Sequence, residues 1–348
     1  MAYEGVVEDV RRAIALERPA RLPVFTCSEE FDVKWYGRYT YEEVCQDGDK
    51  IAEVWIAAIE EFDYDWAWLQ VDDCFEFEPL GVGTHGEGNI LRATRDYLPA
   101  TRKTLQQLRI PDPSTDGRMP EKLKAIRRVR EHFGDSVLVV GSCAAPYSSV
   151  GLLFGLEETM MLAMTDQELL DEACRFFVEL QAVYIQAQVD AGAHAIWLGD
   201  CNAYSGFLSL DQYQRFAAPA CRELVRRAHQ CGAVVHLMNS EVSTPHILAE
   251  SELGVDIIAC GPDADMAEVR SALTGKTCFS GNLDPIEVLM RGTPERVAQE
   301  AERLVRTCYP DGGYVFCTGE MNPRDTPEEN MRAMIEAVRR TSESLSSP

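Results

Sequence analysis

The stretch that decides the fold is Gly312-Gly-Tyr-Val-Phe-Cys-Thr-Gly-Glu-Met-Asn-Pro-Arg-Asp-Thr-Pro-Glu-Glu-Asn330. Its apolar run from Tyr314 to Cys317 predicts a short β-strand, and Thr326-Pro-Glu-Glu predicts the start of a helix. Cys317 and Glu320, at the end of the strand, carry groups that can bind a metal ion or a proton. A reactive loop between a strand and a helix is typical of barrel enzymes. The alternative is an ordinary connection with a buried thiol and a solvated carboxylate.

The pattern of that stretch recurs along the whole chain. Short runs rich in β-branched and aromatic residues predict eight strands, at 22–26, 66–70, 137–140, 195–198, 234–237, 256–259, 277–280 and 314–317. Helical stretches with apolar residues at three-to-four spacing lie between them, at 49–62, 166–191, 211–230, 264–273, 294–306 and 327–340. Strands that alternate with helices in this number predict an α/β fold, a single (β/α)8 barrel of the TIM type.

The barrel is expected to occupy residues 19–342 as one catalytic domain. Residues 1–18 predict a helix that leads into it, and the Ser-rich end at 343–348 is expected to be frayed. The chain has 348 residues, of which 46% are hydrophobic, so it can bury a large core. His85, in Gly83-Thr-His-Gly86, is expected in a flexible loop that could reach the site.

The charge of the chain excludes several kinds of partner. The formal net charge is −24, which disfavours nucleic acid, an anionic membrane surface and a polyanionic substrate, because each would be repelled. Basic residues gather only between Lys122 and Arg130, where interleaved apolar residues predict a solvated helix face.

The cysteines and the apolar segments indicate a cytoplasmic protein. The twelve cysteines contain no C-x-x-C pair, so neither a disulfide framework nor a zinc ribbon is expected, and a reducing compartment is implied. No apolar leader precedes residue 20, so no secretory signal is expected. The uncharged window 136–156 contains Gly, Ser and Pro and predicts a buried strand that runs into a loop, and not a membrane span.

If the strands form a barrel, the polar residues just after them ring one of its ends. They are Cys27, Ser28, Glu29, Glu30, Asp72, Asp73, Ser142, Cys143, Asp200, Cys201, Asn202, His236, Met238, Asn239, Cys260, Asp263, Asn282, Asp284, Cys317 and Glu320. Carboxylates, thiols and amides at this end predict a catalytic site. The set contains no Lys or Arg, which favours a neutral or cationic substrate, or a cation among the ligands.

Several motifs resemble those of the uroporphyrinogen decarboxylase superfamily. They are Gly141-x-x-x-x-Pro146, Ala195-Ile-Trp-Leu-Gly-Asp200, Val235-His-Leu-Met-Asn239, Gly281-Asn-Leu-Asp-Pro285 and Gly313-Tyr-Val-Phe with Thr326-Pro-Glu-Glu-Asn330. Asp72, eight residues before Leu80-Gly81, also resembles an aspartate of the superfamily. The resemblance covers about residues 20–342, and it implies the same barrel that the periodicity predicts.

The chain departs from the true decarboxylases of this superfamily. They carry an Arg-Gln-Ala-Gly-Arg segment after the first strand, which holds the carboxylates of the substrate. The corresponding region here is Phe25-Thr-Cys-Ser-Glu-Glu-Phe-Asp32, with acidic residues in place of the arginines. The comparison disfavours porphyrinogen decarboxylation and leaves a cofactor-free decarboxylase of a small carboxylic acid, centred on Asp72, as an alternative.

The chain also resembles the zinc-dependent methyltransferases of corrinoid pathways. His236 matches their histidine ligand, whereas Met238 and Glu320 stand where two cysteine ligands are found. The resemblance therefore implies a harder zinc site made of His236, Glu320 and either Cys317 or Asp200. Such a site would suit the polarisation of an ether or alcohol oxygen.

This resemblance is closest in character to the substrate-side component of anaerobic O-demethylases. The implied reaction moves a methyl group from a small methoxylated aromatic molecule to cobalamin on a corrinoid protein. Transfer from a methyl-corrinoid to a thiol or another acceptor, and a non-catalytic scaffold that binds a corrinoid partner, remain alternatives. The oligomeric state is left open, with a homodimer among the options.

Particular side chains can be assigned to this reaction. Asp72 or Asp73 could protonate the departing oxygen, or could serve instead as a cap, and Asp200 is a further catalytic candidate. The expected substrate contacts are Glu29, Tyr147, Asn202, Tyr204, Asn239 and Asn282. Further aromatic residues near strand ends could line a pocket or pack inside the barrel, namely Trp66, Trp68, Phe75 and Trp197.

Overall fold

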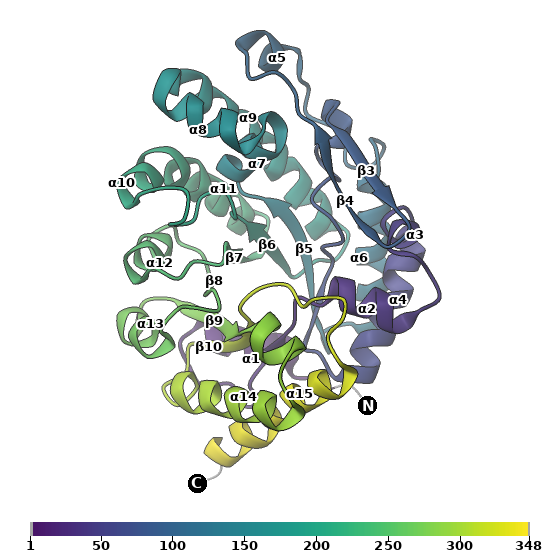
Figure 1. The fold of residues 1–348 in the computed structure, drawn as a ribbon, viewed down its shortest axis with the longest axis vertical. Coiled ribbons are helices and arrows are strands. Elements are labelled where there is room, and N and C mark those ends of the chain that lie inside the picture. Colours follow the sequence, from purple (N-terminus) through teal and green to yellow (C-terminus); the bar gives the residue numbers. More distant parts are fainter. Residues whose placement is uncertain (1–2, 347–348) are drawn as a thin grey trace.

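A computed structural model describes residues 3–346, and its centre is one sheet of eight parallel strands (Figure 1). The strands are β1 (Val24–Phe25), β2 (Trp66–Trp68), β5 (Leu138–Ala144), β6 (Ala195–Gly199), β7 (Val234–Met238), β8 (Ile257–Ala259), β9 (Cys278–Leu283) and β10 (Tyr314–Thr318). Their order is β1-β10-β9-β8-β7-β6-β5-β2. A hydrogen bond of 3.1 Å from the Asp65 amide to the Val24 carbonyl brings the two outermost strands together. The sheet is thus nearly closed, and the predicted barrel with its eight strands is confirmed.

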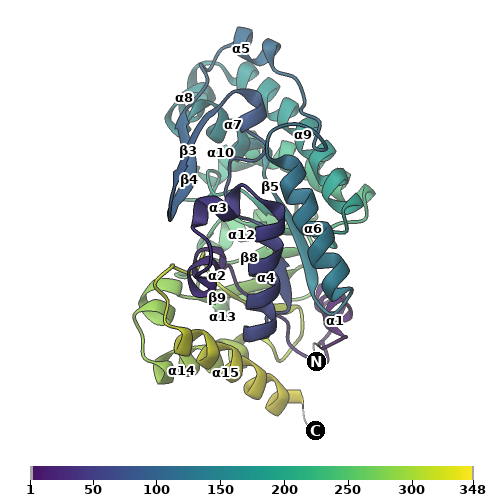
Figure 2. The same ribbon diagram turned by 90° about the vertical axis from the view of Figure 1, so that its right-hand side faces the viewer.

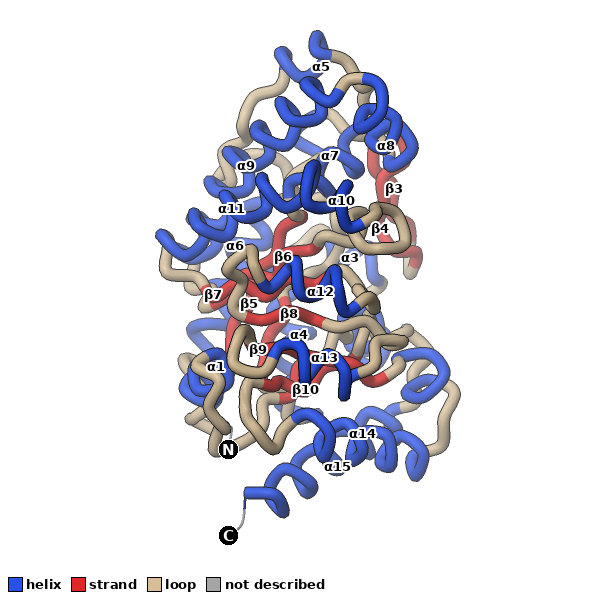
Figure 3. Tube along the Cα trace, turned by 90° about the vertical axis from the view of Figure 1, so that its left-hand side faces the viewer, coloured by secondary structure: helices blue, strands red, loops and turns tan. Residues whose placement is uncertain are grey.

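Helices surround the strands, which lie in the middle of the molecule (Figure 3). They are α1 (Val6–Ile14), α2 (Glu29–Tyr36), α3 (Tyr41–Cys45), α4 (Gly48–Phe62), α5 (Arg102–Gln107), α6 (Met119–Phe133), α7 (Pro146–Phe154), α8 (Leu156–Thr165), α9 (Gln167–Asp190), α10 (Leu210–Gln212), α11 (Ala218–Gln230), α12 (Thr244–Ser251), α13 (Met266–Leu273), α14 (Pro294–Cys308) and α15 (Glu328–Ser346). Two π-helical segments, Tyr213–Ala217 and Pro285–Met290, and a short 3-10 turn, Glu78–Leu80, complete the set.

Three local predictions need correction. The last helix continues to Ser346, so residues 343–346 of the predicted frayed end are helical. Residues 347–348, the rest of that predicted end, lie outside the described part of the chain. The loop expected within 136–156 contains helix α7, which begins at Pro146, a residue that suits the first turn of a helix. His85 lies in a strand, because 83–96 form a hairpin of β3 (Gly83–Glu87) and β4 (Ile90–Asp96).

The hairpin escaped prediction because its strands carry Gly, Thr and charged residues and no buried face. Strands with both faces polar give no period-two signal. In Figure 2 the hairpin projects on one side of the molecule, and helix α1 lies on the opposite side. These two elements therefore mark the two ends of the barrel.

Aromatic side chains fill the interior of the barrel. The Phe25 and Trp66 rings stack with centroids 4.4 Å apart, Trp66 stacks on Trp68 at 5.9 Å, and Trp68 meets Trp197 edge to face at 5.2 Å. Alternate residues of each strand point inward, so Trp66 and Trp68 of β2 both face the interior, where they meet Phe25 of β1 and Trp197 of β6. Of the two roles left open for the tryptophans, the structure shows barrel packing, and Phe75 is fully buried as well.

Helix α1 closes the amino end of the barrel. Its side chains Val6, Val7, Val10 and Ala13 pack against the same interior cluster, which they cover from below. The burial of this apolar face explains why the predicted lead-in helix forms where it does.

All twelve cysteines are free thiols. Within residues 3–346, no helix has the length and apolar character needed to cross a membrane.

Candidate active site at the mouth of the barrel

The carboxyl ends of the strands form the mouth of the barrel, where polar side chains from several loops gather. Glu29 follows β1, Asp73 follows β2, Cys201 follows β6 and Glu320 follows β10. Burial raises the pKa of Glu29, Asp73 and Cys201, and the charge of Glu320 raises each of them further, so these groups lie close enough to act on one another. The barrel has thus brought together residues that are up to 291 positions apart in the sequence, Glu29 and Glu320.

Asp73 is the most exposed carboxylate of this group. Protein atoms nevertheless surround it closely, and this desolvation raises the pKa of Asp73 to about 6. The charges of Glu76, Asp72 and Glu320 act in the same direction, whereas the Lys122 ammonium opposes them. The Gln70 side-chain amide donates a hydrogen bond to the Asp73 carboxylate. Asp73 is therefore held in place and can exchange a proton near neutral pH.

Glu29 and Glu320 are also held in a way that favours their protonated forms. Glu29 is the first residue of α2 and is buried, and burial raises its pKa well above the usual range. One of its oxygens, Oε2, has no hydrogen-bond partner among the described residues. Burial likewise raises the pKa of Glu320, which accepts hydrogen bonds from the Ser240 hydroxyl and, at 2.9 Å, from the Met321 amide.

Asp200 is the centre of a second polar group at the mouth. The Ser148 hydroxyl donates to Oδ1 of Asp200 at 2.7 Å, and the Asn202 backbone amide donates to the Ser148 hydroxyl at 3.0 Å. Neither Oδ2 of Asp200 nor the nearby Tyr147 hydroxyl has a partner within residues 3–346. Burial raises the pKa of Asp200 to about 6. A ligand that offers a donor to Oδ2 and a second polar atom to Tyr147 would satisfy both.

Tyr204 lies at the edge of the same loop, where it is half-buried. Its ring meets Phe207 edge to face, with centroids 5.0 Å apart. Among the aromatic candidates it is thus a surface residue beside the mouth.

Asp72, the residue that resembles the superfamily's aspartate, forms an ion pair with Arg118. The Arg118 guanidinium donates to both of its oxygens at 2.9 Å, and the Cys74 amide donates to Oδ1 at 2.8 Å. Both side chains are buried, so this is a bidentate ion pair shielded from water. As placed, Asp72 anchors the loop after β2, and its oxygens are not free to receive a substrate.

Two predicted contact residues also point toward the protein. The Asn239 side-chain amide donates to Glu250 at 2.5 Å, and Asn239 Oδ1 accepts from the Glu241 amide at 3.2 Å. The Asn282 amide donates to the carbonyls of Gly261 and Ala264, both at 2.9 Å. In this arrangement Asn239 and Asn282 hold the loops that shape the mouth.

The three residues of the implied zinc site do not come together. His236 lies in the barrel interior, with its ring centroid 5.6 Å from Trp66 and 6.1 Å from Phe25, and its Nε2 is 2.9 Å from the Ser280 hydroxyl. Burial lowers the pKa of His236 to about 3, so the imidazole is neutral. Its Nδ1 has no partner within the described chain. Cys317 is also buried in the interior, beside Cys27, whose pKa is raised by burial and further by the Cys317 thiol.

These placements decide how well zinc fits. Glu320 accepts a hydrogen bond from the Ser240 hydroxyl, and no charged group contributes to the pKa shift of His236. Across residues 3–346 no set of three or more His, Cys, Asp or Glu side chains is placed to hold a metal ion. The donor set implied by the resemblance therefore does not fit zinc as the side chains stand.

Two cations behind the mouth were missed by the sequence interpretation. Arg118 and Lys122 lie at the start of α6, and both are buried, so the prediction of a solvated face fails for Lys122. The signal was available, because Lys122 lies three residues after Met119 and four before Ile126, both on the buried face of the helix. A lysine on an apolar helix face indicates a buried partner.

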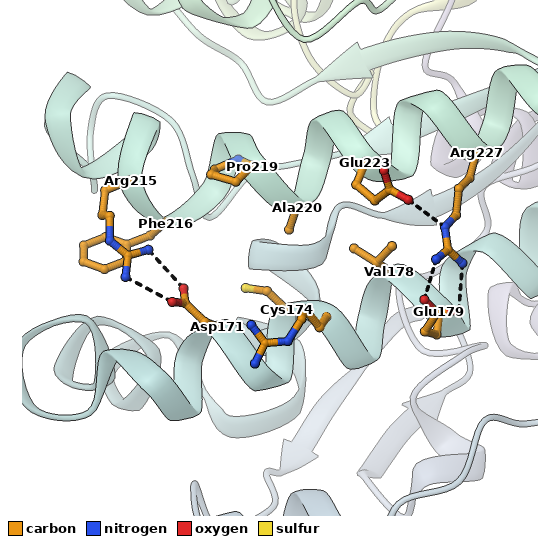
Figure 4. Close-up of a pocket in the computed structure, with 11 residues that line it drawn as sticks. Asp171, Cys174, Val178, Glu179, Arg215, Phe216, Pro219, Ala220, Glu223 and Arg227 are labelled. Atoms are coloured by element: carbon orange, nitrogen blue, oxygen red, sulfur yellow. Dashed lines mark hydrogen bonds and ion pairs between the residues drawn. The ribbon is translucent and has the colours of Figure 1, made fainter.

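A separate pocket of about 450 Å³ lies between the outer helices α9 and α11 (Figure 4). Four of its charged residues pair across the groove, Arg215 with Asp171 and Arg227 with Glu179, and Arg175 also lines it. Because those charges are already matched, this pocket is a weaker candidate than the mouth, where several polar atoms lack partners.

Comparisons with known proteins agree with the fold and the motifs. A sequence profile described as Uroporphyrinogen decarboxylase (URO-D) matches residues 7–341. The uroporphyrinogen decarboxylase of Koribacter versatilis (strain Ellin345) is 27% identical over 321 residues, 89% of this chain and 88% of its own length. That of Solibacter usitatus (strain Ellin6076) is 28% identical over 311 residues, 85% of each chain.

Solved structures share the barrel at low identity. A methyltransferase from Methanosarcina mazei superposes with a TM-score of 0.86 at 21% identity, covering 96% of this chain and 98% of its own. A B12-independent methionine synthase from Shewanella sp. W3-18-1 superposes with a TM-score of 0.56 at 9% identity, covering 87% and 89%. At these identities the likeness is one of fold.

Proposed function

The chain belongs to the uroporphyrinogen decarboxylase (URO-D) family, and from that membership and the mouth we propose that it is a methyltransferase. The reaction moves a methyl group from a small methoxylated aromatic molecule to a corrinoid carried by a partner protein. The fold shared with a methyltransferase from Methanosarcina mazei supports this choice within an enzyme family.

The observation that carries the proposal is the ion pair between Asp72 and Arg118. A decarboxylase that relies on Asp72 would need its carboxylate free, and here both oxygens accept from Arg118 at 2.9 Å. Among the cations in the segments that follow the strands, Arg118 is paired with Asp72, and Arg324 lies 3.4 Å from the Glu30 carboxylate. The nearby Lys122 is engaged by Ser142 and Gln70. A substrate with several carboxylates would therefore meet carboxylates and no free cation, whereas a neutral ether would not be repelled.

Asp73 would supply the proton that demethylation requires. When the bond between the methyl carbon and the ether oxygen breaks, its electron pair stays on oxygen. A protonated Asp73, with a pKa of about 6, can donate to that oxygen and make it a better leaving group. Asp200 Oδ2 and the Tyr147 hydroxyl, which lack partners among the described residues, could orient the substrate.

The corrinoid, when present on the partner, supplies the nucleophile that accepts the methyl group. The chain needs only a mouth that the partner can reach, and the exposed side chains of Asp73 and Cys201 meet that requirement. No step depends on zinc, since the implied ligands do not converge. The free thiols favour a reducing, cytoplasmic setting for such a reaction.

An apolar surface beside the mouth supports a protein partner. Met160, Met161 and Met164 on α8 are exposed, and with Phe207 they line a groove of about 640 Å³. Tyr204 packs on Phe207, which connects this surface to the loop that carries Asp200. Methionine-rich exposed surfaces are typical of protein interfaces, so we place the corrinoid protein here.

The experiment that tests the proposal mixes the protein with 2-methoxyphenol and chemically reduced cobalamin, and follows methylcobalamin by its absorption spectrum. We expect methylcobalamin and catechol in equal amounts, and no carbon dioxide. Asp73→Asn should abolish the product, whereas Asp211→Asn, which alters an exposed aspartate outside the mouth, should not. Release of carbon dioxide from small carboxylic acids without cobalamin would instead establish the decarboxylase. Methylation of a thiol by methylcobalamin, with no demethylation of 2-methoxyphenol, would show that the methyl group moves from the corrinoid to an acceptor, in the direction opposite to the proposal.

A further inference from the structure

A chain of hydrogen bonds connects a buried lysine to the exposed Asp73. The Lys122 ammonium donates to the Ser142 hydroxyl, to the Ser142 carbonyl at 3.2 Å and to Gln70 Oε1 at 3.4 Å. The Ser142 hydroxyl donates to Gln70 Oε1, and the Gln70 amide donates to Asp73 Oδ1. The chain runs from α6 through β5 and the loop after β2 to the mouth.

The chemistry of these groups allows only one direction for the chain. An ammonium group can only donate, and an ionised carboxylate can only accept. Ser142 must therefore accept from Lys122 and donate onward, and the Gln70 amide must turn its oxygen toward Ser142 and its nitrogen toward Asp73. The orientation of Gln70, and with it the position of Asp73, depends on the charge of Lys122.

The surroundings hold Lys122 and Ser142 firmly. Lys122 is buried, which lowers its pKa, while the negative charges of Glu76 and Asp72 act in the opposite direction and favour the ammonium form. Its nitrogen also lies 5.1 Å from the ring centroid of Phe75. Gln188 fixes the Ser142 backbone, since it accepts from the Ser142 amide at 2.8 Å and donates to the Ser142 carbonyl at 3.1 Å.

We propose that Lys122 is a positioning residue that acts on Asp73 through Ser142 and Gln70, and so sets the proton affinity of the acid at the mouth. The inference rests on the proposed function, in which Asp73 is the proton donor. It adds a residue on α6 that lies behind the mouth.

The sign of the effect follows from the groups that face Asp73. Glu76 and Asp72, from the loop after β2, and Glu320, from the loop after β10, favour the protonated acid. Lys122, from α6, is the cation that favours the ionised form. The Gln70 amide also stabilises the carboxylate by hydrogen bonding. Removal of Lys122 or of the Gln70 amide should therefore raise the affinity of Asp73 for its proton.

The test measures the titration of Asp73 directly, by NMR of protein labelled with 13C at the aspartate carboxyl carbons. The Asp73 signal is the one missing from Asp73→Asn. In Lys122→Met we expect the midpoint to rise by about one pH unit, and in Gln70→Leu by a similar amount. The double variant should move little further than either single variant, because both changes break one chain.

Controls separate the proposed role from a structural one. Lys124→Met removes an exposed lysine two positions along the same helix, which pairs with Asp49 and Glu121, and should leave the Asp73 midpoint unchanged. If Lys122→Met does not fold, Gln70→Leu and Ser142→Ala still test the chain, since neither removes a buried charge. An unmoved midpoint in both variants would overturn the inference.

The outcome is distinguishable from that of the proposed function. The titration needs no substrate, so a shifted midpoint without any demethylation supports the inference and rejects the reaction. If the protein demethylates 2-methoxyphenol, the pH at which the rate falls should move upward in Gln70→Leu by the same amount as the midpoint. Demethylation with an unmoved pH profile would retain the reaction and overturn the role of Lys122.

Discussion

At the amino end of the barrel, Asp9 and Asp65 have partners for both carboxylate oxygens, whereas at the mouth Glu29 and Asp200 each leave one oxygen without a partner in residues 3–346. Asp9 accepts from the Ala20 amide at 2.7 Å and the Arg21 amide at 3.1 Å. Asp65 pairs with Arg339 at 2.7 Å and with Arg21 at 3.4 Å.

The difference shows what each end of the barrel is for. Buried carboxylates with complete partners join segments of the chain, and they contribute to stability. Buried carboxylates with an open oxygen raise the free energy of the folded protein unless a ligand or a proton satisfies them. The amino end thus carries paired carboxylates, whereas the mouth combines one anchoring ion pair, Asp72 with Arg118, with acids that leave an oxygen open.

The largest effect is expected at the amino end. Asp65→Ala leaves the half-buried Arg339 and the Val24 amide without their acceptor, and should lower the free energy of unfolding by about 3–5 kcal/mol. Urea unfolding followed by circular dichroism measures this loss. Asp211→Ala, at an exposed site, should change stability by about 0.5 kcal/mol or less. A loss below about 1 kcal/mol in Asp65→Ala would show that the paired carboxylates are not what stabilises this end.

The next largest effect is expected in the rate of demethylation, which the proposal assigns to the mouth. Asp73→Asn removes the proton donor and should lower the rate of demethylation by about 10²–10⁴-fold, with the melting temperature nearly unchanged because the side chain is exposed. In the parent the rate should fall as the pH rises above about 6, since the acid then loses its proton. A variant with the full rate would remove Asp73 from the reaction.

Substitution of Asp200 is expected to change the free energy of unfolding by less than substitution of Asp65, and in the opposite direction. The pKa of Asp200 is about 6 in the folded protein and about 3.9 in the unfolded chain, so the fold loses stability as the pH rises from about 3.9 to about 6, and the loss is complete above that range. Asp200→Asn should therefore gain about 1–2 kcal/mol of stability at pH 8 and nothing below pH 4. Thermal unfolding at the two pH values measures the gain. A loss at pH 8 would mean that the open oxygen is satisfied in solution.

The binding of a partner should also distinguish the two ends. Met164→Glu places a charge in the apolar groove beside the mouth and should weaken binding of a corrinoid protein about tenfold. Arg11→Glu on α1, at the amino end, should leave the affinity unchanged. Calorimetric titration gives both constants, and equal weakening by the two changes would contradict docking at the mouth.

The smallest expected effect concerns metal. Because no three-ligand set is formed by the described residues, His236→Ala should leave the zinc content of the purified protein unchanged. Elemental analysis of parent and variant decides the question. One zinc per parent chain that is lost in the variant would restore the implied site and would require the mouth to rearrange.

Much of the fold could be predicted from the sequence. The eight strands were found because buried parallel strands are near-continuous apolar runs, and the helices because their apolar residues recur on one face. The hairpin of β3 and β4 was missed because its strands, such as Ile90–Asp96, contain no fully buried residue and carry no such pattern. Hydrophobic periodicity arises where one face of an element is buried, so it cannot identify an element that has no buried face.

The site was predicted only in part. The motifs placed Asp73, Asp200 and Glu320 at one end of the barrel, because the order of strands and helices determines where the loops lie. They did not show that Asp72 is held by Arg118, since the two residues are 46 positions apart and come from different elements. Nor did they show that His236 is buried in the barrel interior, where its Nε2 lies 2.9 Å from the Ser280 hydroxyl.

The sequence by itself determined the barrel, the family and the residues that reach the mouth, because these depend on hydrophobic periodicity and on short motifs. Only the tertiary structure decided which of those residues are free. Whether a carboxylate is an anchor or an acid depends on whether a cation from another element lies within hydrogen-bonding distance. For the neighbouring residues Asp72 and Asp73, that distance depends on how α6 packs against the barrel, which no local pattern encodes.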